Sequence, residues 1–369
     1  MNILVVHGQR LENYPPVRSL IDILTRNGHK VTIITKCGED PGITNPSLLK
    51  IIRLPENDNQ KSALNAVNYF RKKRIMTSLV EREMKNNDIL WTTTDSTVRD
   101  LGDIVFRYRH VMQLMELIED MPAVPGLKYP TLNIKKYAQK AYKVVVPEYN
   151  RAQIQKTWWE LKKLPDVLPN KMSSTEIPEP KDEIRELLNK IDSEGSKIIL
   201  YQGSFSGDRN LDVFAEAINA LDGKYALYLM GRDSEERKLL CSKYPRIQYI
   251  PFIAPPYHLL VSRRAYIGLL PYVPGRIGFN SVLNALYCAP NKIFEFSGFG
   301  VPMLGNDVPG LTIPFEAYNI GKVRKEGTVD EIRHLIELID ANHNVMSENC
   351  IRYYNSFDLD SIVNRIIEE

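Results

Sequence analysis

The chain has 369 residues, of which 43% are hydrophobic and 25% are charged, the composition of a soluble globular protein long enough for two domains. No apolar run approaches the length of a membrane span, and the start MNILVVHGQR lacks the basic leader and long apolar stretch of a signal peptide. The four cysteines are scattered without C-x-x-C spacing, so neither a zinc site nor a disulfide scaffold is indicated, and a reducing cytoplasm fits best.

The charge is distributed unevenly along the chain. The net charge is only +3, but residues 1–170 contain 26 Lys+Arg and 18 Asp+Glu, against 22 and 27 in the remainder. A basic first half suggests partners such as anionic lipid or a phosphorylated acceptor, with chance asymmetry as the alternative. The basic residues are not interleaved with aromatics in an RNA- or DNA-binding signature, so we expect no nucleic-acid partner. The run FRKKR, residues 70–74, predicts either a helix lying on an anionic membrane or a solvated basic helix.

Short apolar runs alternate with longer helical patterns throughout, which predicts an α/β protein with parallel sheets. The first predicted helix runs from Pro16 to Arg26 and is stopped by Asn27-Gly28. The predicted strands of the first half are Ile3–Val6, Val31–Thr35, Ile89–Thr92, Ile104–Tyr108 and Lys143–Pro147, and those of the second half are Ile198–Tyr201, Ala226–Met230, Ile247–Pro251, Ile267–Leu270 and Val301–Leu304.

Between the two halves lies a polar, proline-rich segment that is typical of an interdomain connection. We therefore predict two Rossmann-like, doubly wound domains that face a cleft, residues 1–169 and 196–349, joined by a linker over 170–195. Residues 350–369 have apolar side chains at helical spacing and predict a C-terminal helix that packs back on the protein. Doubly wound sheets bind their ligands at the carboxyl ends of the strands, so the cleft is the expected ligand site.

The stretch YCAPNKIFEFSGFGVP, residues 287–302, predicts a phosphate site. Pro290 suits the first position of a helix, and Asn291, Lys292 and Ile293 would then present free backbone N–H groups to an anion. Lys292 is unfavourable at this end of a helix unless an anion binds there. Glu295 lies three residues further on the same side and could accept hydrogen bonds from hydroxyls attached to that phosphate. The alternative is an ordinary helix with a solvated Lys and Glu.

A second phosphate candidate is YQGSFSGDRNLDVFAEAI, residues 201–218. It follows a predicted strand, is rich in Gly and Ser, and leads into an apolar helix. Gly203 and Ser204 could let the backbone approach a ligand closely, and Arg209 could clamp a diphosphate through its planar guanidinium. Such turns are common, but two of them in one domain favour a shared anion site.

Taken together, these segments resemble the GT-B glycosyltransferases, and in particular the large retaining family called GT4. APNKIFEFSGFGVPML is similar to the family's donor-site helix, and GSFSGDRNLDVFAEAI resembles its loop of basic diphosphate ligands. YLMGRDSEERKLL and IQYIPFIAPPYHLL resemble the strands and loops beside the nucleotide, and VVVPEYNRAQIQ and VLPNKM resemble the end of the first domain. The likeness covers nearly all of the chain in order.

The resemblance implies a role for each matching residue of the donor site. Glu295 would bind the ribose hydroxyls, and Lys292, the backbone near Asn291 and Arg209 would meet the diphosphate, with Lys292 and Arg209 stabilising it as it leaves. Phe252 and Ile253 would flank the base, and Gly203, Ser204 and Gly231 would shape the turns around it.

The sequence departs from the family pattern at two positions. Tyr287 stands where the family often has a first Glu, which we interpret as a trait of a subfamily whose donor-site helix begins with PNK. Ser204 stands where the family often has Arg, so one diphosphate cation would be missing.

On the acceptor side, His7 and Gly8 lie in the first predicted strand-to-helix loop, and Asp95 follows a later strand. His110 follows the predicted strand IVFRYR, at a position where family members often carry a functional His. A lone His is more often structural than functional, so both interpretations of His110 stay open. The sequence contains no recognisable Ser–His–Asp arrangement.

We therefore predict transfer of a sugar from a UDP- or GDP-sugar, with retention, to a saccharide or lipid-linked acceptor in surface polysaccharide assembly. Arg209 and Lys292 would replace a metal ion, since no D-x-D signature stands in a suitable loop, and no cofactor is expected. The protein would be cytoplasmic, or peripheral on the inner face of the membrane. Two alternatives remain: a nucleotide-sugar 2-epimerase of the same fold, and a catalytically idle nucleotide-sugar-binding subunit, which the departures at Tyr287 and Ser204 favour.

Overall fold

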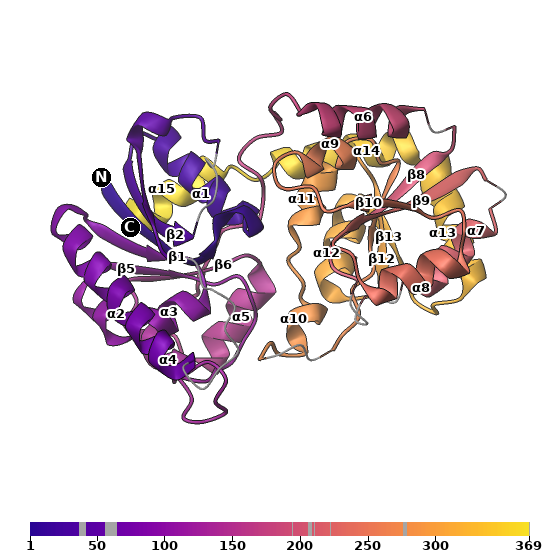
Figure 1. Cartoon of the computed structure of the whole chain (residues 1–369). Coiled ribbons are helices and arrows are strands. Elements are labelled where there is room, and N and C mark those ends of the chain that lie inside the picture. The colour runs from indigo at the N-terminus through magenta and orange to yellow at the C-terminus, as the bar shows by residue number, and fades with distance from the viewer. Residues whose placement is uncertain are drawn as a thin grey trace. The chain divides into compact units, whose positions relative to one another are not determined.

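The chain folds into two compact units in the computed structural model (Figure 1). The first unit comprises residues 1–173 together with 276–284 and 358–369, and the second comprises 174–275 and 285–357. The structure describes residues 1–36, 42–55, 65–193, 195–205, 209, 211–221, 223–275 and 279–368.

The first unit is built on a seven-stranded sheet with the order β3-β2-β1-β4-β5-β6-β7. Every strand pairs in parallel with its neighbours. The strand order reverses between β1 and β4, which makes the sheet doubly wound and places a ligand-binding crevice at the carboxyl ends of those two strands. The strands are β1 (Asn2–Arg10), β2 (Lys30–Lys36), β3 (Leu49–Arg53), β4 (Ile89–Thr92), β5 (His110–Gln113), β6 (Lys143–Val146) and β7 (Asp166–Val167).

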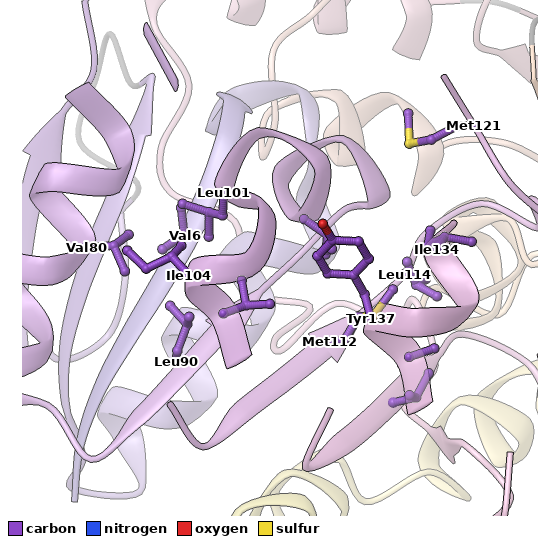
Figure 2. Close-up of a cluster of buried hydrophobic side chains, with 14 of the residues drawn as sticks. Val6, Val80, Leu90, Leu101, Ile104, Met112, Leu114, Met121, Ile134 and Tyr137 are labelled. Atoms are coloured by element: carbon purple, nitrogen blue, oxygen red, sulfur yellow. The ribbon is translucent and has the colours of Figure 1, made fainter. Parts of the chain in front are cut away.

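The apolar run at the start of β1 explains why this strand is central. Its residues Ile3, Leu4, Val5 and Val6 are all fully buried, as expected for a strand covered by helices on both faces. Ile3 and Val5 join the core beneath α1 and α15, whereas Leu4 and Val6 join the core beneath α2, α3 and α4, part of which Figure 2 shows. The helices of this unit are α1 (Pro15–Arg26), α2 (Asn65–Glu83), α3 (Asp95–Leu101), α4 (Ile134–Lys140), α5 (Tyr149–Trp158) and α15 (Leu359–Glu368).

The second unit repeats this architecture with a six-stranded parallel sheet of order β10-β9-β8-β11-β12-β13. Here the order reverses between β8 and β11. Its strands are β8 (Lys197–Gln202), β9 (Tyr225–Gly231), β10 (Gln248–Pro251), β11 (Ile267–Leu270), β12 (Met303–Asn306) and β13 (Gly321–Arg324). Its helices are α6 (Asp182–Asp192), α7 (Asp212–Asn219), α8 (Glu235–Lys243), α9 (His258–Ser262), α11 (Asn291–Ser297), α12 (Pro309–Tyr318), α13 (Val329–Ala341) and α14 (His343–Asn355), and the short α10 (Leu283–Leu286) lies where the chain passes from one unit to the other.

The prediction of two Rossmann-like sheets is confirmed, and nine of the ten predicted strands overlap an observed one. The strand predicted at Ile104–Tyr108 is wrong, because this segment is a 3-10 helix, Gly102–Arg107, and the strand β5 begins at His110. Ile104 and Val105 are buried all the same. A short apolar run is consistent with either a buried strand or a buried helical turn, and periodicity alone cannot separate the two.

Two further segments differ from the prediction. The expected linker over 170–195 contains the helix α6, whose residues Leu188 and Ile191 are buried. The single helix expected over 350–369 is broken: α14 ends at Asn355 and α15 begins at Leu359. Between them, the Asp358 carboxylate accepts hydrogen bonds from the backbone N–H and hydroxyl of Ser361, at 3.1 and 2.6 Å, and so caps the start of α15.

The prediction that the C-terminal helix packs back on the protein is confirmed. Figure 1 shows α15, in yellow, beside α1 of the first unit. Leu359, Val363, Ile366 and Ile367 of α15 are buried in the core that α1 covers. The Arg26 guanidinium binds the Asp360 carboxylate at 2.6 Å. Within the described part of the chain, no helix is long and apolar enough to cross a bilayer.

Candidate functional site in the second unit

A hollow opens at the carboxyl ends of β8 and β11, the adjacent strands between which the order of the second sheet reverses. Ligands of doubly wound sheets bind at this position because the loops that follow the two strands part there in opposite directions. The hollow is lined by Tyr201, Gln202, Gly203, Ser204, Arg209, Leu269, Leu270, Pro271, Tyr272 and Lys292. Four of these, Gly203, Ser204, Arg209 and Lys292, were predicted as site residues; residues 206–208 and 210 of the same loop lie outside the described residues.

Two cationic side chains border the hollow. The Arg209 guanidinium lies over the ring of Tyr272, with its central carbon 4.5 Å from the ring centroid, an arrangement that holds the guanidinium in place by a cation–π attraction. Burial lowers the pKa of Lys292, and the charge of Arg209 lowers it further, while Glu295 acts in the opposite direction. The surroundings of Lys292 thus disfavour its charge, and a bound anion would offset that cost.

Gly203 and Gly231 let the turns around the hollow pack against each other. A Cβ atom on Gly231 would lie 2.1 Å from the carbonyl oxygen of Gly203, so no other residue fits there without moving the backbone. Gly203 has a φ of +146°, a region that residues with a side chain rarely adopt. Its N–H donates to the carbonyl of Met230 at 2.9 Å, which fixes the end of β8 against β9.

Glu295 is buried, with 5% of the residue exposed, beside the hollow. One carboxylate oxygen accepts a hydrogen bond from Gln202 Nε2 at 2.6 Å, and the other lies 3.4 Å from His258 Nε2. Burial by itself would raise the pKa of Glu295, but His258 and then Lys292 outweigh burial, so the pKa is lowered and the carboxylate is ionised. The hydroxyl of Ser262 donates to Gln202 Oε1 at 2.8 Å and completes the network.

The prediction from the sequence identified Glu295 but missed the residues that hold it. Gln202 is the last residue of β8, and His258 and Ser262 are the first and last residues of α9. The spacing of four residues between His258 and Ser262 puts both on one face of a helix, a signal that the sequence contained. Nothing in the sequence indicates that Gln202 would meet them.

The predicted anion site at the start of the donor-site helix is only partly supported. Pro290 is the residue that precedes α11 and not its first residue, because its ψ of 137° is extended. The N–H of Ile293 is not free, since it donates to the carbonyl of Pro290 at 3.2 Å. The helix has only seven residues, so the side chains of Lys292 and Arg209, and not the start of the helix, are the candidate anion-binding groups.

The residues predicted near the base lie outside the lining of the hollow. Phe252 follows β10, is 46% exposed, and has the guanidinium carbon of Arg232 at 4.9 Å from its ring centroid. Ile253 is partly buried. Asn291, whose backbone was predicted to meet the diphosphate, is also partly buried and also lies outside the lining. Within the described residues, no group of three or more His, Cys, Asp and Glu side chains is arranged to hold a metal ion.

In the first unit, His7 and Gly8 belong to β1 itself and not to the predicted loop after it, because this strand extends to Arg10. Asp95 begins α3 just after β4, the strand beside β1 at the point where the order of that sheet reverses. His7 is fully buried, its Nδ1 lies 2.8 Å from the hydroxyl of Thr93, and burial lowers its pKa to about 3. The N–H of Gly8 donates to the hydroxyl of Thr97 at 3.1 Å. Burial raises the pKa of Asp95, to which the charge of a neighbouring carboxylate contributes.

His110 does not belong to this group. It is the first residue of β5, is 2% exposed, and its Nε2 lies 2.8 Å from the hydroxyl of Thr92 on β4. Burial lowers its pKa to about 3, which keeps the imidazole neutral. The functional interpretation of His110, as a catalytic residue, depended on a loop position after a strand. The structure instead places His110 inside the sheet, so we do not retain that interpretation.

No protein-family model matches the sequence, and no curated protein matches it. Similar solved structures cover essentially the whole chain. Sucrose-phosphate synthase from Thermosynechococcus elongatus superposes with a TM-score of 0.67 at 16% identity, over 100% of this chain and 98% of that chain. Anabaena HepE in complex with UDP and glucose superposes with a TM-score of 0.67 at 12% identity, over 100% and 98%.

A third structure is a Listeria monocytogenes protein assigned as a UDP-N-acetylglucosamine 2-epimerase. It superposes with a TM-score of 0.61 at 13% identity, over 100% of this chain and 94% of that chain. At such identities a likeness establishes the fold and leaves the activity open. The chain therefore has the GT-B fold, two Rossmann-like units each built on a doubly wound parallel sheet.

Proposed function

We propose that this protein is a glycosyltransferase that takes a sugar from a nucleoside-diphosphate sugar bound in the hollow of the second unit. The observation that carries the proposal is the pairing of two cations, Arg209 and Lys292, with the ionised Glu295 at the point where the second sheet reverses its order. The two cations can bind a diphosphate, and an ionised carboxylate can accept hydrogen bonds from the hydroxyls of a ribose. HepE, which has the same fold, has been crystallised with UDP and with UDP-glucose, which supports a uridine nucleotide as the first donor to try.

Arg209 and Lys292 have the electrostatic role in this proposal. When the bond between the sugar and the diphosphate breaks, negative charge grows on the departing diphosphate. Side chains already fixed beside it lower the energy of that state without having to reorganise. The pKa of Lys292 is lowered by burial and by the nearby charge of Arg209. The electrostatic stabilisation from the two cations is therefore largest when the negative charge of the departing diphosphate appears beside them. The two cations would take the place of a metal ion, so we propose a metal-independent reaction.

The acceptor would bind to the first unit, where Asp95 stands at the reversal point of the other sheet. By resemblance to the retaining GT4 family, we propose retention of configuration and a saccharide or lipid-linked acceptor in surface polysaccharide assembly. The basic character of residues 1–170 and the exposed Arg71 and Arg74 of α2 support contact with an anionic membrane surface. The same features agree with a cytoplasmic protein on the inner face of that membrane.

The test is turnover of labelled donors by the purified protein. UDP-glucose, UDP-N-acetylglucosamine and GDP-mannose are each incubated with and without a lipid-linked saccharide extract, and label is followed in the extract and in the donor. A glycosyltransferase moves label into the extract with at least one donor. Conversion of UDP-N-acetylglucosamine into its 2-epimer without extract would establish the epimerase instead. Donor binding without turnover on any extract would establish an idle binding subunit.

A further inference from the structure

The contact between Arg209 and Tyr272 brings a cation and an aromatic ring together on the lining of the hollow. An arginine side chain has many rotamers, and ordering it when a ligand binds costs conformational entropy. A cation that is already in place stabilises a bound anion without that cost. The attraction between the guanidinium and the face of the ring, at 4.5 Å from its centroid, favours one position of Arg209 over the others.

This contact does not use the groups of Arg209 that would bind an anion. An arginine contacts a ring through the face of the guanidinium, whereas its N–H donors lie in the plane of that group and form the fork that binds a phosphate. Burial raises the pKa of Tyr272 above its ordinary value, so the ring is neutral and is not an anionic competitor for Arg209. Tyr272 can therefore hold the guanidinium while a diphosphate binds to it.

The backbone of Tyr272 is held on both sides. Tyr272 stands just after the end of β11, and its N–H donates to the carbonyl of Leu270 at 3.0 Å. Its own carbonyl accepts a hydrogen bond from Nδ2 of Asn306 at 2.9 Å. Asn306 is the last residue of the neighbouring strand β12 and is only 7% exposed. The ring that carries Arg209 is thus attached to the ends of two paired strands.

The orientation of the Asn306 amide is set in turn by Arg324, the last residue of β13. Arg324 Nε donates to Asn306 Oδ1 at 2.5 Å, and the guanidinium carbon of Arg324 lies 4.8 Å from the ring centroid of Phe214. A guanidinium has donors only, so the amide oxygen must face Arg324 and the amide nitrogen faces Tyr272. A continuous series of contacts therefore leads from Arg324 through Asn306 and Tyr272 to Arg209.

We propose that Tyr272 and Asn306 are positioning residues for the diphosphate: Tyr272 holds Arg209 in place, and Asn306, oriented by Arg324, holds Tyr272. This inference depends on the proposed function, because it specifies how one of the cations that meet the diphosphate is kept in position before the ligand arrives. The aromatic ring at position 272, and not its hydroxyl, then sets the affinity for the phosphate part of the ligand and leaves the affinity for the nucleoside unchanged.

The test is a double-mutant cycle between Tyr272 and Arg209, with calorimetry of UDP and uridine, or of GDP and guanosine if GDP is the nucleotide that binds. The variants are Tyr272→Leu, Arg209→Ala and the two combined. Leu keeps apolar bulk but has no ring, whereas Tyr272→Phe keeps the ring and loses only the hydroxyl. Asn306→Asp keeps the oxygen that meets Arg324 but has no N–H to donate to the carbonyl of Tyr272.

The matched control is Tyr225→Leu. Tyr225 also contacts a cation through its ring, with Lys224 Nζ at 5.3 Å from the ring centroid. Tyr225 is the first residue of β9, so it lies at the edge of the parallel sheet opposite to the carboxyl ends where the hollow opens. A loss of affinity that follows from disturbing any such pair in the second unit would appear in this variant too.

We expect Tyr272→Leu to weaken UDP binding about fivefold and Tyr272→Phe to stay within about twofold of wild type, because the ring provides the attraction. Uridine affinity should be unchanged in both. In the Arg209→Ala background, Tyr272→Leu should change UDP affinity by less than about twofold, since no guanidinium is left to position. Asn306→Asp should weaken UDP binding in the same direction but less, and Tyr225→Leu should bind both ligands as wild type does.

An equal loss of UDP affinity from Tyr272→Leu with and without Arg209 would mean that Tyr272 is only structural and would overturn the proposal. Equal losses in Tyr272→Phe and Tyr272→Leu would assign the effect to the hydroxyl and would also overturn it. Should Tyr272→Leu fail to fold, the same cycle with Asn306→Asp decides the question. A wild-type protein that binds UDP or GDP no better than Tyr272→Leu does would overturn this inference and leave the donor site standing. A wild-type protein that binds neither nucleotide would overturn the proposed function itself.

Discussion

Replacing Lys292 by Met should weaken diphosphate binding while nucleoside binding stays unchanged. Lys292 lines the hollow beside Arg209, so we expect its ammonium group to donate a charge-assisted hydrogen bond to the diphosphate. Such a bond contributes about 1.5–3 kcal/mol, which corresponds to a loss of about 10- to 150-fold in affinity. Calorimetry with UDP and with uridine measures the affinity for the nucleoside diphosphate and the affinity for the nucleoside separately. Lys325→Met, at an exposed lysine of the same unit, is the control and should bind both ligands as wild type does.

The pH dependence follows from the direction of the pKa shift. Burial, the largest cause, lowers the pKa of Lys292 in the free protein, and a bound diphosphate should raise it again. Binding therefore takes up a proton, and affinity should fall as the pH rises through the lowered pKa. Lys292→Arg keeps its charge at every accessible pH, so its affinity should not show this fall.

Calorimetry in two buffers of different ionisation enthalpy detects the proton uptake directly. Wild type should take up protons on binding UDP at alkaline pH, and Lys292→Arg should not. If Lys292→Met and wild type bind UDP equally, with equal dependence on pH, then Lys292 does not contact the diphosphate and the reasoning is refuted.

Three further predictions concern other parts of the chain. Arg209→Ala should lower turnover by about 10²–10³-fold and leave uridine affinity unchanged; equal turnover would place Arg209 outside the reacting site. Burial lowers the pKa of His110 from 6.5 to about 3, so between these pH values the unfolded chain binds more protons than the folded protein. As the pH is lowered from 6.5 towards 3, the free energy of unfolding should therefore fall by about 1.4 kcal/mol per pH unit. Urea denaturation of His110→Gln should show a correspondingly shallower fall, and an identical fall would contradict the buried neutral imidazole. Replacing the exposed Arg71 and Arg74 by Gln should weaken binding to anionic vesicles at low salt more than replacing the exposed pair Lys162–Lys163 does. An equal loss of binding in the two double variants, or no vesicle binding by wild type, would refute the proposed contact with a membrane surface.

The architecture could be predicted from the sequence because short apolar runs and longer helical patterns alternate through both halves. Ile3–Val6 and Ile267–Leu270 are continuous apolar runs, as strands covered on both faces must be. The segment at Ile104 was predicted as a strand and is a 3-10 helix, because burial of a short run does not determine its backbone conformation. The short edge strand β7, Asp166–Val167, has only two residues and gives too little pattern to detect.

The cationic part of the candidate site was also within reach of the sequence. Arg209 lies in the segment that follows β8 and Lys292 lies in the first turn of α11, and parallel strands bring the segments that follow them to one edge of the sheet. The surroundings of Glu295 were not within reach. Gln202 and His258 are 56 positions apart in the sequence and meet Glu295 only through tertiary packing. His110 shows the converse error, since a titratable residue near a strand end has no signal that separates a ligand contact from a buried hydrogen bond to Thr92.

The central claim is that the second unit holds a nucleoside-diphosphate site, and a thermal-shift panel of UDP, GDP, ADP and CMP with their sugar derivatives tests it most directly. A ligand at 100 times its dissociation constant should stabilise the protein by about 2.7 kcal/mol. We predict that UDP or GDP raises the unfolding temperature of wild type, and that the increase is much smaller in the variant Lys292→Met. An unfolding temperature that none of these nucleotides or nucleotide sugars changes would contradict the account.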